Sequence, residues 1–205
     1  MSAFSDPDED SIRAQLKAEI RTRRLATRRA LPAEARNARS AAITARVLSL
    51  PEWGAARTVL AFVSMAREVQ TGALVEAAWR AGKAVATTRM SPTRDDLELF
   101  AWREGDLLEE SGMMFRQPLA SAPRVDDAAI DLALVPALAA DERGHRIGYG
   151  KGFYDRLLPR LDAARVALVF DFERIVEVPN RPGDEPVDVV VTDERVVRTG
   201  ARAGR

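Results

Sequence analysis

The hydrophobic residues at the start of the chain recur with a helical period. Ile12, Leu16 and Ile20 are spaced by four residues, which predicts a helix over about 11–30 with these side chains facing inward. Acidic residues crowd the segment before this helix and no apolar run follows them. We therefore expect residues 1–10 to form an acidic tail that lies outside the fold and ends in the cap of the helix.

A proline separates this helix from a second one. Pro32 suits the first turn of a helix, because its missing N–H group needs no partner there. The second helix is expected to end near Leu50. The residues that its apolar pattern turns inward are Ala42, Ile43, Val47 and Leu48.

From residue 57 the pattern changes to short apolar runs that are rich in β-branched residues, as in buried strands. Such strands alternate with helical segments, which is typical of an α/β fold with a parallel or mixed sheet covered on both faces. We expect one domain over residues 11–200, followed by a tail over 201–205. The predicted strands are 57–64, 83–89, 97–102, 130–135, 165–170 and 187–191, and the predicted helices among them are 71–81 and 153–161.

Composition narrows the chemistry. Hydrophobic residues make up 46% of the 205 positions, and 31 basic residues balance 31 acidic ones. The chain has no cysteine and one histidine, which excludes disulfides, thiolate-bound zinc and thiol catalysis. Its longest apolar stretch is too short to span a bilayer, and the acidic start has no signal-peptide core. We expect a soluble protein of the cytoplasm.

A loop with three alternating glycines is the clearest candidate site. Gly148, Gly150 and Gly152 flank Lys151, after a predicted strand and before a predicted helix. Backbone amides at glycines can approach an anion closely, and the lysine adds a positive charge, so a phosphate is the natural ligand. The spacing is neither that of a Walker A loop nor that of a dinucleotide fingerprint, because Phe153 stands where these motifs need other residues. A flexible turn is the alternative.

The neutral total hides a local excess of positive charge. Residues 13–46 contain ten basic and two acidic residues, so their net charge is 10 − 2 = +8. On charge pattern alone a solvated helix face is the first interpretation; contact with a polyphosphate and binding of nucleic acid are the alternatives. Aromatic residues are few and none interleaves with the cations, which argues against stacking on bases. Five of these cations share one narrow helix face: Arg13, Lys17, Arg21, Arg24 and Arg28.

Two carboxylates are candidate magnesium ligands. Asp155 lies in the first turn of the helix after the glycines, and Asp188 lies near the start of the last predicted strand. Carboxylates near a phosphate site can hold Mg²⁺, usually with several waters. The alternatives are a favourable charge at a helix start for Asp155 and a charge at a strand edge for Asp188. His145, the single histidine, is expected at the surface rather than in catalysis.

Four segments occur in an order that one enzyme family shares. The most specific is Arg146-Ile-Gly-Tyr-Gly-Lys-Gly-Phe-Tyr-Asp155, preceded by Asp131-Leu-Ala-Leu-Val-Pro136 and Asp141. The others are Lys17-Ala-Glu-Ile-Arg21, Val63-Ser-Met-Ala-Arg-Glu68 and Val187-Asp188. Together they resemble the signature of the 5-formyltetrahydrofolate cyclo-ligase family, whose enzymes are also called 5,10-methenyltetrahydrofolate synthetases. The resemblance covers nearly the whole chain and implies a three-layer α/β/α sandwich with a mostly parallel sheet behind two N-terminal helices.

The resemblance implies an activity and its site. The family uses ATP and Mg²⁺ to close 5-formyltetrahydrofolate into 5,10-methenyltetrahydrofolate by phosphorylating the formyl oxygen, which N10 then displaces. By position, the family's catalytic groups fall on Lys151, Arg146 and Tyr154, and its Mg²⁺ ligands on Asp155 and Asp188. Its ATP contacts fall on Lys17, Arg21, Arg146, Ile147, Gly148, Tyr149, Gly150, Lys151, Gly152, Phe153 and Tyr154, and its substrate contacts on Val63, Glu68, Tyr149, Gly150, Lys151, Gly152, Phe153 and Tyr154.

Three positions depart from the family pattern. Ala137 and Ala140 stand where Gly and Phe are common, and Phe153 stands where Tyr is frequent. These changes affect the expected folate pocket more than the ATP chemistry. A diverged enzyme that transfers phosphate from ATP to another small molecule is therefore the second hypothesis, and a nucleic-acid-binding protein is the third. The first hypothesis gives a monomer whose partners are ATP and 5-formyltetrahydrofolate, with no nucleic acid and no membrane.

Overall fold

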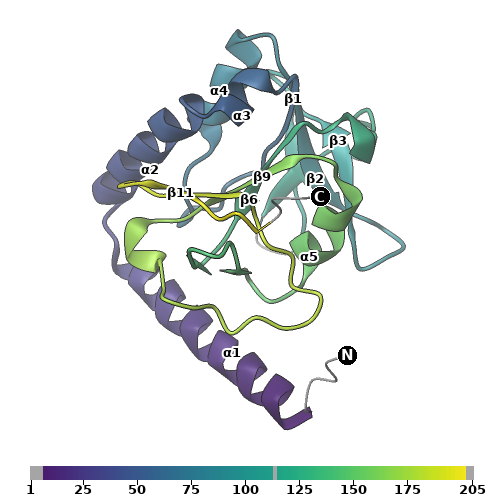
Figure 1. The fold of residues 1–205 in the computed structure, drawn as a ribbon. Helices are drawn as coiled ribbons and strands as arrows, with labels where there is room; N and C mark the ends of the chain where they lie inside the picture. The colour runs from purple at the N-terminus through teal and green to yellow at the C-terminus, as the bar shows by residue number, and fades with distance from the viewer. Residues whose placement is uncertain (1–6, 113–114, 202–205) are drawn as a thin grey trace.

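The computed structural model describes residues 7–112 and 115–201. Its centre is a sheet of seven described strands in the order β11-β10-β9-β6-β1-β2-β3 (Figure 1). The five inner strands are parallel, and the two edge strands β3 and β11 are antiparallel to their neighbours. This confirms the expected mixed sheet. The strands are β1 (Thr58–Leu60), β2 (Ala84–Met90), β3 (Leu97–Ala101), β6 (Leu132–Pro136), β9 (Ala164–Leu168), β10 (Val189–Val191) and β11 (Val196–Arg198).

Helices cover both faces of the sheet. Successive strand residues point to opposite faces, so strands that are apolar throughout present an apolar surface on each side. Val59 and Leu132 face the helices that precede β2, whereas Leu60 and Ala133 face the helix that follows β6. The first layer contains α2 (Ala33–Leu48), α3 (Pro51–Ala55) and α4 (Gly72–Arg80), and the opposite layer contains α5 (Phe153–Leu157) with the 3₁₀ turn η2 (Leu158–Arg160). The expected three-layer α/β fold is therefore confirmed.

Smaller elements complete the described chain. Two short hairpins consist of β4 (Leu108–Glu110) with β5 (Arg116–Pro118), and β7 (Ala139–Ala140) with β8 (Arg146–Ile147). Two further 3₁₀ turns are η1 (Asp127–Ala129) and η3 (Asp171–Glu173). The long helix α1 (Pro7–Ala30) lies apart from the sheet and runs past the β7–β8 hairpin (Figure 1). Among the described residues, no helix is both long and apolar enough to cross a membrane.

Several expected boundaries were wrong. Helix α1 begins at Pro7, so residues 7–10 are helical rather than part of a tail, and the acidic side chains of its first turn suit the positive end of the helix dipole. The expected tails over 1–6 and 202–205 lie outside the described residues. The second helix ends at Leu48 and a new one starts at Pro51. The helix at 153 ends at Leu157, where Pro159 tightens the chain into a 3₁₀ turn.

The predicted inward face of α1 was also wrong. Ile12 and Leu16 are 57% and 43% exposed, and of the expected stripe only Ile20 packs against a buried apolar cluster, which Ala139, Ile147 and Val178 form. In α2, Ile43 and Val47 are buried as expected, but Leu48 is 40% exposed. The face that α1 turns toward the body of the protein is the polar one described below.

Candidate functional site

A cavity of about 690 Å³ opens at the carboxyl edge of the sheet, where β1 and β6 end. The chain continues from β1 to β2 on one side and later returns to β6 on the other side, so the loops after β1 and β6 diverge. Open parallel sheets commonly bind ligands at such a point. The walls come from α1, the loop after β1, the segment 146–156 and the loop 181–184.

The cavity brings together residues from distant parts of the sequence. Lys17 and Arg21 reach it from α1, and Val63 and Glu68 reach it from the loop after β1. The whole signature segment from 146 to 155 lines it as well. Every residue that the sequence assigned to ATP or to the substrate is therefore in one lining, whereas Asp188 is not.

The glycine loop, residues 148–152, is folded against α1. Gly150 and Gly152 have φ angles of +98° and +66°, which residues with a side chain rarely adopt. A Cβ atom at Gly150 would lie 3.1 Å from the guanidinium carbon of Arg21. The Nε of Arg21 donates to the carbonyl of Gly148 over 3.0 Å. The exposed Lys151 is thus held at the cavity by a loop whose backbone requires glycine.

All five cations of the basic stripe on α1 contact the body of the protein. Arg13 donates to the carbonyl of Asn180 over 3.0 Å, and Arg24 donates to the carbonyl of Phe172 over 2.7 Å. Lys17 forms an ion pair with Asp184. Arg21 bonds to the glycine loop, and Arg28 is buried. The interpretation of this stripe as a solvated helix face was therefore wrong.

Arg146 and Asp155 are held together at the start of α5. The guanidinium of Arg146 is buried, and its Nη1 donates to Oδ1 of Asp155 over 3.0 Å and to the carbonyl of Glu185 over 2.7 Å. The same carboxylate oxygen accepts from the backbone N–H of Glu185 over 3.2 Å. The Asp155 side chain keeps 30% of its surface exposed, so it can still reach a ligand in the cavity.

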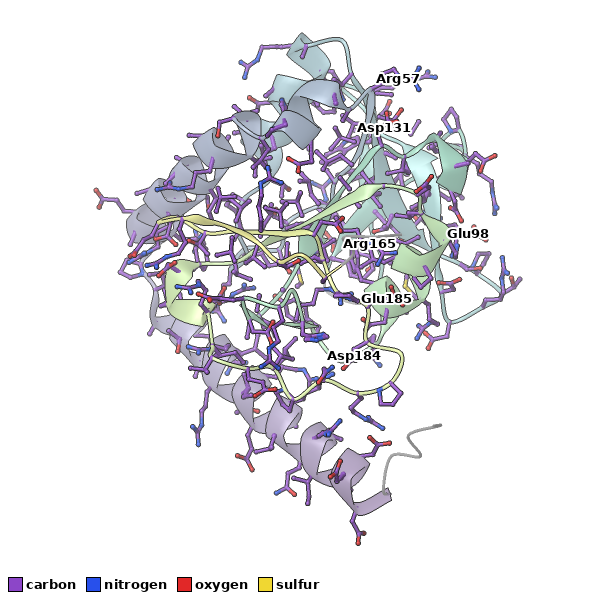
Figure 2. The ribbon with its side chains drawn as sticks, in the orientation of Figure 1. Arg57, Glu98, Asp131, Arg165, Asp184 and Glu185 are labelled. Atoms are coloured by element: carbon purple, nitrogen blue, oxygen red, sulfur yellow. The ribbon has the colours of Figure 1, made fainter. Side chains whose placement is uncertain are left out.

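Asp188 lies elsewhere. Its Oδ2 accepts from the backbone N–H of Arg165 over 2.8 Å, beside the start of β9. The described residues contain no cluster of three or more metal-binding side chains, and the pairing of Asp155 with Asp188 at one ion stays a prediction. Figure 2 shows Asp184 on the loop between α1 and the sheet, and Glu185 close to Arg165. Asp184 lines the cavity, although no motif in the sequence points to it.

A buried carboxylate faces the glycine loop. Glu68 is 4% exposed, and its Oε2 accepts from the backbone N–H of Met65 over 2.8 Å. Burial raises the pKa of Glu68, while the Met65 N–H and the charge of Arg28 lower it. Burial, followed by the charge of Glu68, raises the pKa of Tyr149 and of Tyr154 above the ordinary value. Both phenols therefore stay protonated and can donate a hydrogen bond.

The comparisons with known proteins identify the family of this chain. A model described as the 5-formyltetrahydrofolate cyclo-ligase family matches residues 13–193. The chain belongs to this family. The 5-formyltetrahydrofolate cyclo-ligase of Mycolicibacterium smegmatis is 31% identical over 188 residues, which cover 87% of this chain and 94% of that protein. The enzyme of the same name from Escherichia coli K12 is 29% identical over 178 residues, covering 82% and 96%.

A solved cyclo-ligase fold is also similar. The structure of 5,10-methenyltetrahydrofolate synthetase from Aquifex aeolicus superposes with a TM-score of 0.80 at 29% sequence identity. The match covers 93% of this chain and 95% of that chain, so the α/β architecture is shared over nearly its whole length. The curated relatives carry the name of a ligase, and the segment 146–155 of this chain, the most specific part of the resemblance, lines the cavity.

Sequence reasoning missed some residues of the cyclo-ligase cavity. Phe62, Thr88 and Phe115 line it, but their sequence context resembles that of ordinary strand and loop residues. Arg116 lines it from the start of β5 and Arg181 lines it from a loop, and no motif marks either residue. The available signal for Arg181 was a polar residue in a loop near the last strands. This signal does not distinguish a ligand-binding residue from an ordinary surface residue.

His145 does not line the cavity. It is half-buried, and its Nε2 lies 3.4 Å from the side-chain nitrogen of Asn180. Its backbone N–H donates to Oδ1 of Asp141 over 3.0 Å, inside the turn that joins β7 to β8. The residue is half-buried in this turn, less exposed than the surface position that the sequence predicted, and it lies outside the cavity.

Proposed function

We propose that the protein is a 5-formyltetrahydrofolate cyclo-ligase, which uses ATP to convert 5-formyltetrahydrofolate into 5,10-methenyltetrahydrofolate. One observation supports this most strongly: the segment 146–155, two cations of α1 and a buried carboxylate all line the same cavity. ATP and the folate are the two small-molecule partners of this proposal. The proposal includes a monomer in the cytoplasm as the working form.

The lining combines two kinds of surface that this reaction needs. Positive charge comes from Lys17, Arg21 and Lys151. It lies next to the glycine loop, whose backbone amides can approach a phosphate group closely. Apolar side chains that include Phe62, Phe153 and Leu97 supply a surface for a flat ring system. A site that binds a nucleic acid through its phosphates would not need an enclosed apolar surface.

The proposed reaction has two steps. The formyl oxygen of the folate attacks the γ-phosphorus of ATP, so that a new oxygen–phosphorus bond forms while the bond to ADP breaks. N10 then attacks the activated formyl carbon, the carbon–oxygen bond breaks, inorganic phosphate leaves, and the N10 proton passes to solvent. The protein has to hold the reactants in line and stabilise the charge of the transferring phosphoryl group.

The proposed roles follow from the chemistry of each side chain. Lys151 and Arg146 stabilise charge on the transferring phosphoryl group, and Lys17 and Arg21 hold the rest of the triphosphate. Tyr154 keeps its proton because burial raises its pKa, so it acts as a neutral hydrogen-bond donor. None of these roles needs a thiol or an imidazole, which agrees with the absence of cysteine from the sequence.

A magnesium ion fits one part of this site. Nucleotide-bound Mg²⁺ takes one or two protein carboxylates and keeps several waters. Asp155 lines the cavity with part of its carboxylate exposed, so it is the carboxylate that would hold the ion. When bound, the ion supplies charge neutralisation at the phosphate oxygens. Asp188 is retained as the second proposed ligand on the family resemblance alone.

The decisive experiment mixes the purified protein with 5-formyltetrahydrofolate, ATP and MgCl₂ and follows the absorbance of the methenyl product. Product that appears only when all three are present is the expected result. A thermal-shift measurement with each substrate runs beside it. Stabilisation by ATP but by no folate, without product, would instead favour phosphoryl transfer to another small molecule, the hypothesis that Phe153 in the lining motivates.

A further inference from the structure

Four polar groups lie behind and within the glycine loop, and two of them, Arg28 and Glu173, have no role in the proposed mechanism. Arg28 of α1, Glu173 of η3 and Glu68 of the loop after β1 are buried, whereas Tyr149 of the glycine loop is exposed. We call them the polar quartet. Its members come from four separate segments, and only Tyr149 and Glu68 line the cavity.

Arg28 is fixed on one side by a bidentate ion pair. Its Nε and Nη2 donate to the two carboxylate oxygens of Glu173 over 2.6 and 2.8 Å. The two side chains are 2% and 0% exposed, so this pair is dry. Nη2 also donates to the carbonyl of Ala137 over 2.6 Å, directly after β6. Glu173 in turn accepts from the backbone N–H of Phe170 over 3.0 Å. The direction of the guanidinium is therefore set from outside the cavity.

The remaining nitrogen of Arg28 points toward the cavity wall. Its Nη1 donates to the hydroxyl of Tyr149 over 3.2 Å. Tyr149 is 38% exposed and lines the cavity, so its hydroxyl connects the buried guanidinium of Arg28 to the cavity wall. The positive charge of Arg28 also acts on Glu68, against the effect of burial. Arg28 thus influences both cavity groups without lining the cavity itself.

The position of Arg28 does more than form an ion pair with Glu173. Glu68 and Glu173 repel each other, and Arg28 is the cation that acts on both carboxylates. Without Arg28, two carboxylates would share a poorly solvated region. One arginine for Glu173 alone would satisfy that residue and leave Glu68 unaffected; the observed position serves both.

Arg24 shows what a purely structural anchor on the same helix looks like. It lies four residues before Arg28 and donates over 2.7 Å to the carbonyl of Phe172, next to Glu173. It does not line the cavity, and no hydrogen bond joins it to Tyr149 or Glu68 within the described chain. Arg24 is therefore a matched control for the docking of α1.

We propose that Arg28 is a positioning residue for the folate side of the cavity: held by Glu173, it fixes the Tyr149 hydroxyl and supplies the positive charge that faces Glu68. This rests on the proposed function. Glu68 then accepts hydrogen bonds from N–H groups of the ligand, which the reduced pterin ring of a folate carries. The cations assigned to ATP are other residues, so ATP affinity should depend on Arg28 much less than folate affinity does, although Tyr149 belongs to both assigned sets.

The test compares Arg28→Met, Arg28→Lys and Arg24→Met with the wild type. Calorimetry measures the Kd for 5-formyltetrahydrofolate and for ATP, and the product assay gives KM and kcat. In Arg28→Met, we expect the folate Kd and KM to rise about tenfold with the ATP values nearly unchanged, as for loss of ground-state binding. Arg28→Lys should recover part of the loss, because it keeps the charge but not the fork. Arg24→Met should match the wild type.

A pH series adds a readout that helix docking alone would not move. The groups facing Glu68 are Arg28 of α1, Glu173 of η3, Tyr149 and Tyr154 of the signature segment, and the Met65 N–H. Loss of the cation leaves the repulsion from Glu173, so Glu68 binds its proton at higher pH. The pH at which folate affinity falls on acidification should therefore be higher in Arg28→Met than in the wild type.

The outcomes separate the two proposals. Equal losses for folate and ATP, or the same loss in Arg24→Met, would reduce Arg28 to a structural anchor. If Arg28→Met does not fold, Arg28→Lys and Tyr149→Phe replace it in the test. Unchanged folate affinity in both variants would overturn the proposal. A wild type that binds 5-formyltetrahydrofolate without making product refutes the proposed activity but still tests Arg28 through the Kd. A wild type that does neither refutes both.

Discussion

Single residues in the cavity differ in what their side chains do for the fold. Lys151 is exposed on a loop, whereas Arg146 and Glu68 are buried and hydrogen-bonded to backbone. Gly150 is needed because it has no side chain: Arg21 occupies the space that a Cβ would take. Replacing an exposed cation should therefore affect ligands alone, whereas replacing the glycine should affect both ligands and folding.

Lys151→Ala should lose activity but not stability. Removing one donor that stabilises developing charge typically lowers kcat by about 100-fold. Lys151 is exposed, so its removal leaves no buried group without a partner. Steady-state kinetics and thermal unfolding check this, with Lys151→Arg as the variant that keeps the charge. Unchanged kinetics in Lys151→Ala would contradict a role for the lysine at the phosphate.

Gly150→Ala should weaken ATP binding and destabilise the fold by about 1 kcal/mol or more, because the left-handed backbone and the contact with Arg21 both oppose a Cβ. Gly148→Ala is the comparison for stability, since its φ is not left-handed and a Cβ there meets nothing within 4 Å. Chemical denaturation of both variants measures the difference. Equal free energies of unfolding would show that the strain at Gly150 is not real.

At the scale of elements, the order of strands and helices was predictable and the orientation of α1 was not. Two stripes lie side by side on α1, one apolar and one basic, and the rule that apolar residues face inward favours Ile12 and Leu16. The wall that α1 meets consists of backbone carbonyls and the carboxylates of Asp184 and Glu173, which need donors. These acceptors come from residues more than 100 positions away in the chain.

The same reason explains which site residues the sequence revealed. The glycine loop is a local motif whose backbone chemistry can be recognised in any fold. Asp184 has no such motif, and its partner Lys17 is 167 residues away. Short pairings such as β7 with β8 carry too few residues for a period of two to be visible.

Asp184→Asn should increase the stabilisation that ATP gives. The Lys17–Asp184 pair is mostly buried, so losing the carboxylate leaves the Lys17 charge without its partner and lowers stability by about 1–3 kcal/mol. A phosphate group that replaces the carboxylate restores the pairing. Thermal unfolding with and without ATP should therefore show a larger rise in Tm than in the wild type. The control is Lys17→Met, in which the extra rise should disappear; a smaller rise in Asp184→Asn would contradict the prediction.

On the scale of the whole molecule, the cavity is built at a cost to the fold. Seven described strands and two helical layers bury the apolar core, while Glu68 is placed in a region that raises its pKa. A carboxyl group with a raised pKa binds its proton more tightly in the folded state than in the unfolded state. Its contribution to stability therefore becomes less favourable as pH rises above the unfolded pKa, for which 4.5 is the ordinary value.

Glu68→Gln should consequently raise the Tm at neutral pH, because the buried charge is removed. The gain should shrink on acidification and vanish near about pH 4, where the wild-type carboxyl is protonated in both states. Scanning calorimetry at several pH values measures this, and Glu76→Gln on the exposed side of α4 is the control. A gain that is independent of pH would show that the pKa of Glu68 is the same in the folded and the unfolded protein.

The attachment of α1 by donors rather than by apolar side chains has a consequence for motion. This helix carries two of the cations in the cavity, yet Ile12 and Leu16 remain in solvent. Its release exposes little apolar surface, so it should separate from the sheet as a local unfolding unit, with earlier amide hydrogen exchange than β6 or β9. Any ligand that binds these cations shifts the equilibrium between released and docked α1 toward the docked state. Nucleotide binding is thereby coupled to the docking of the N-terminal helix.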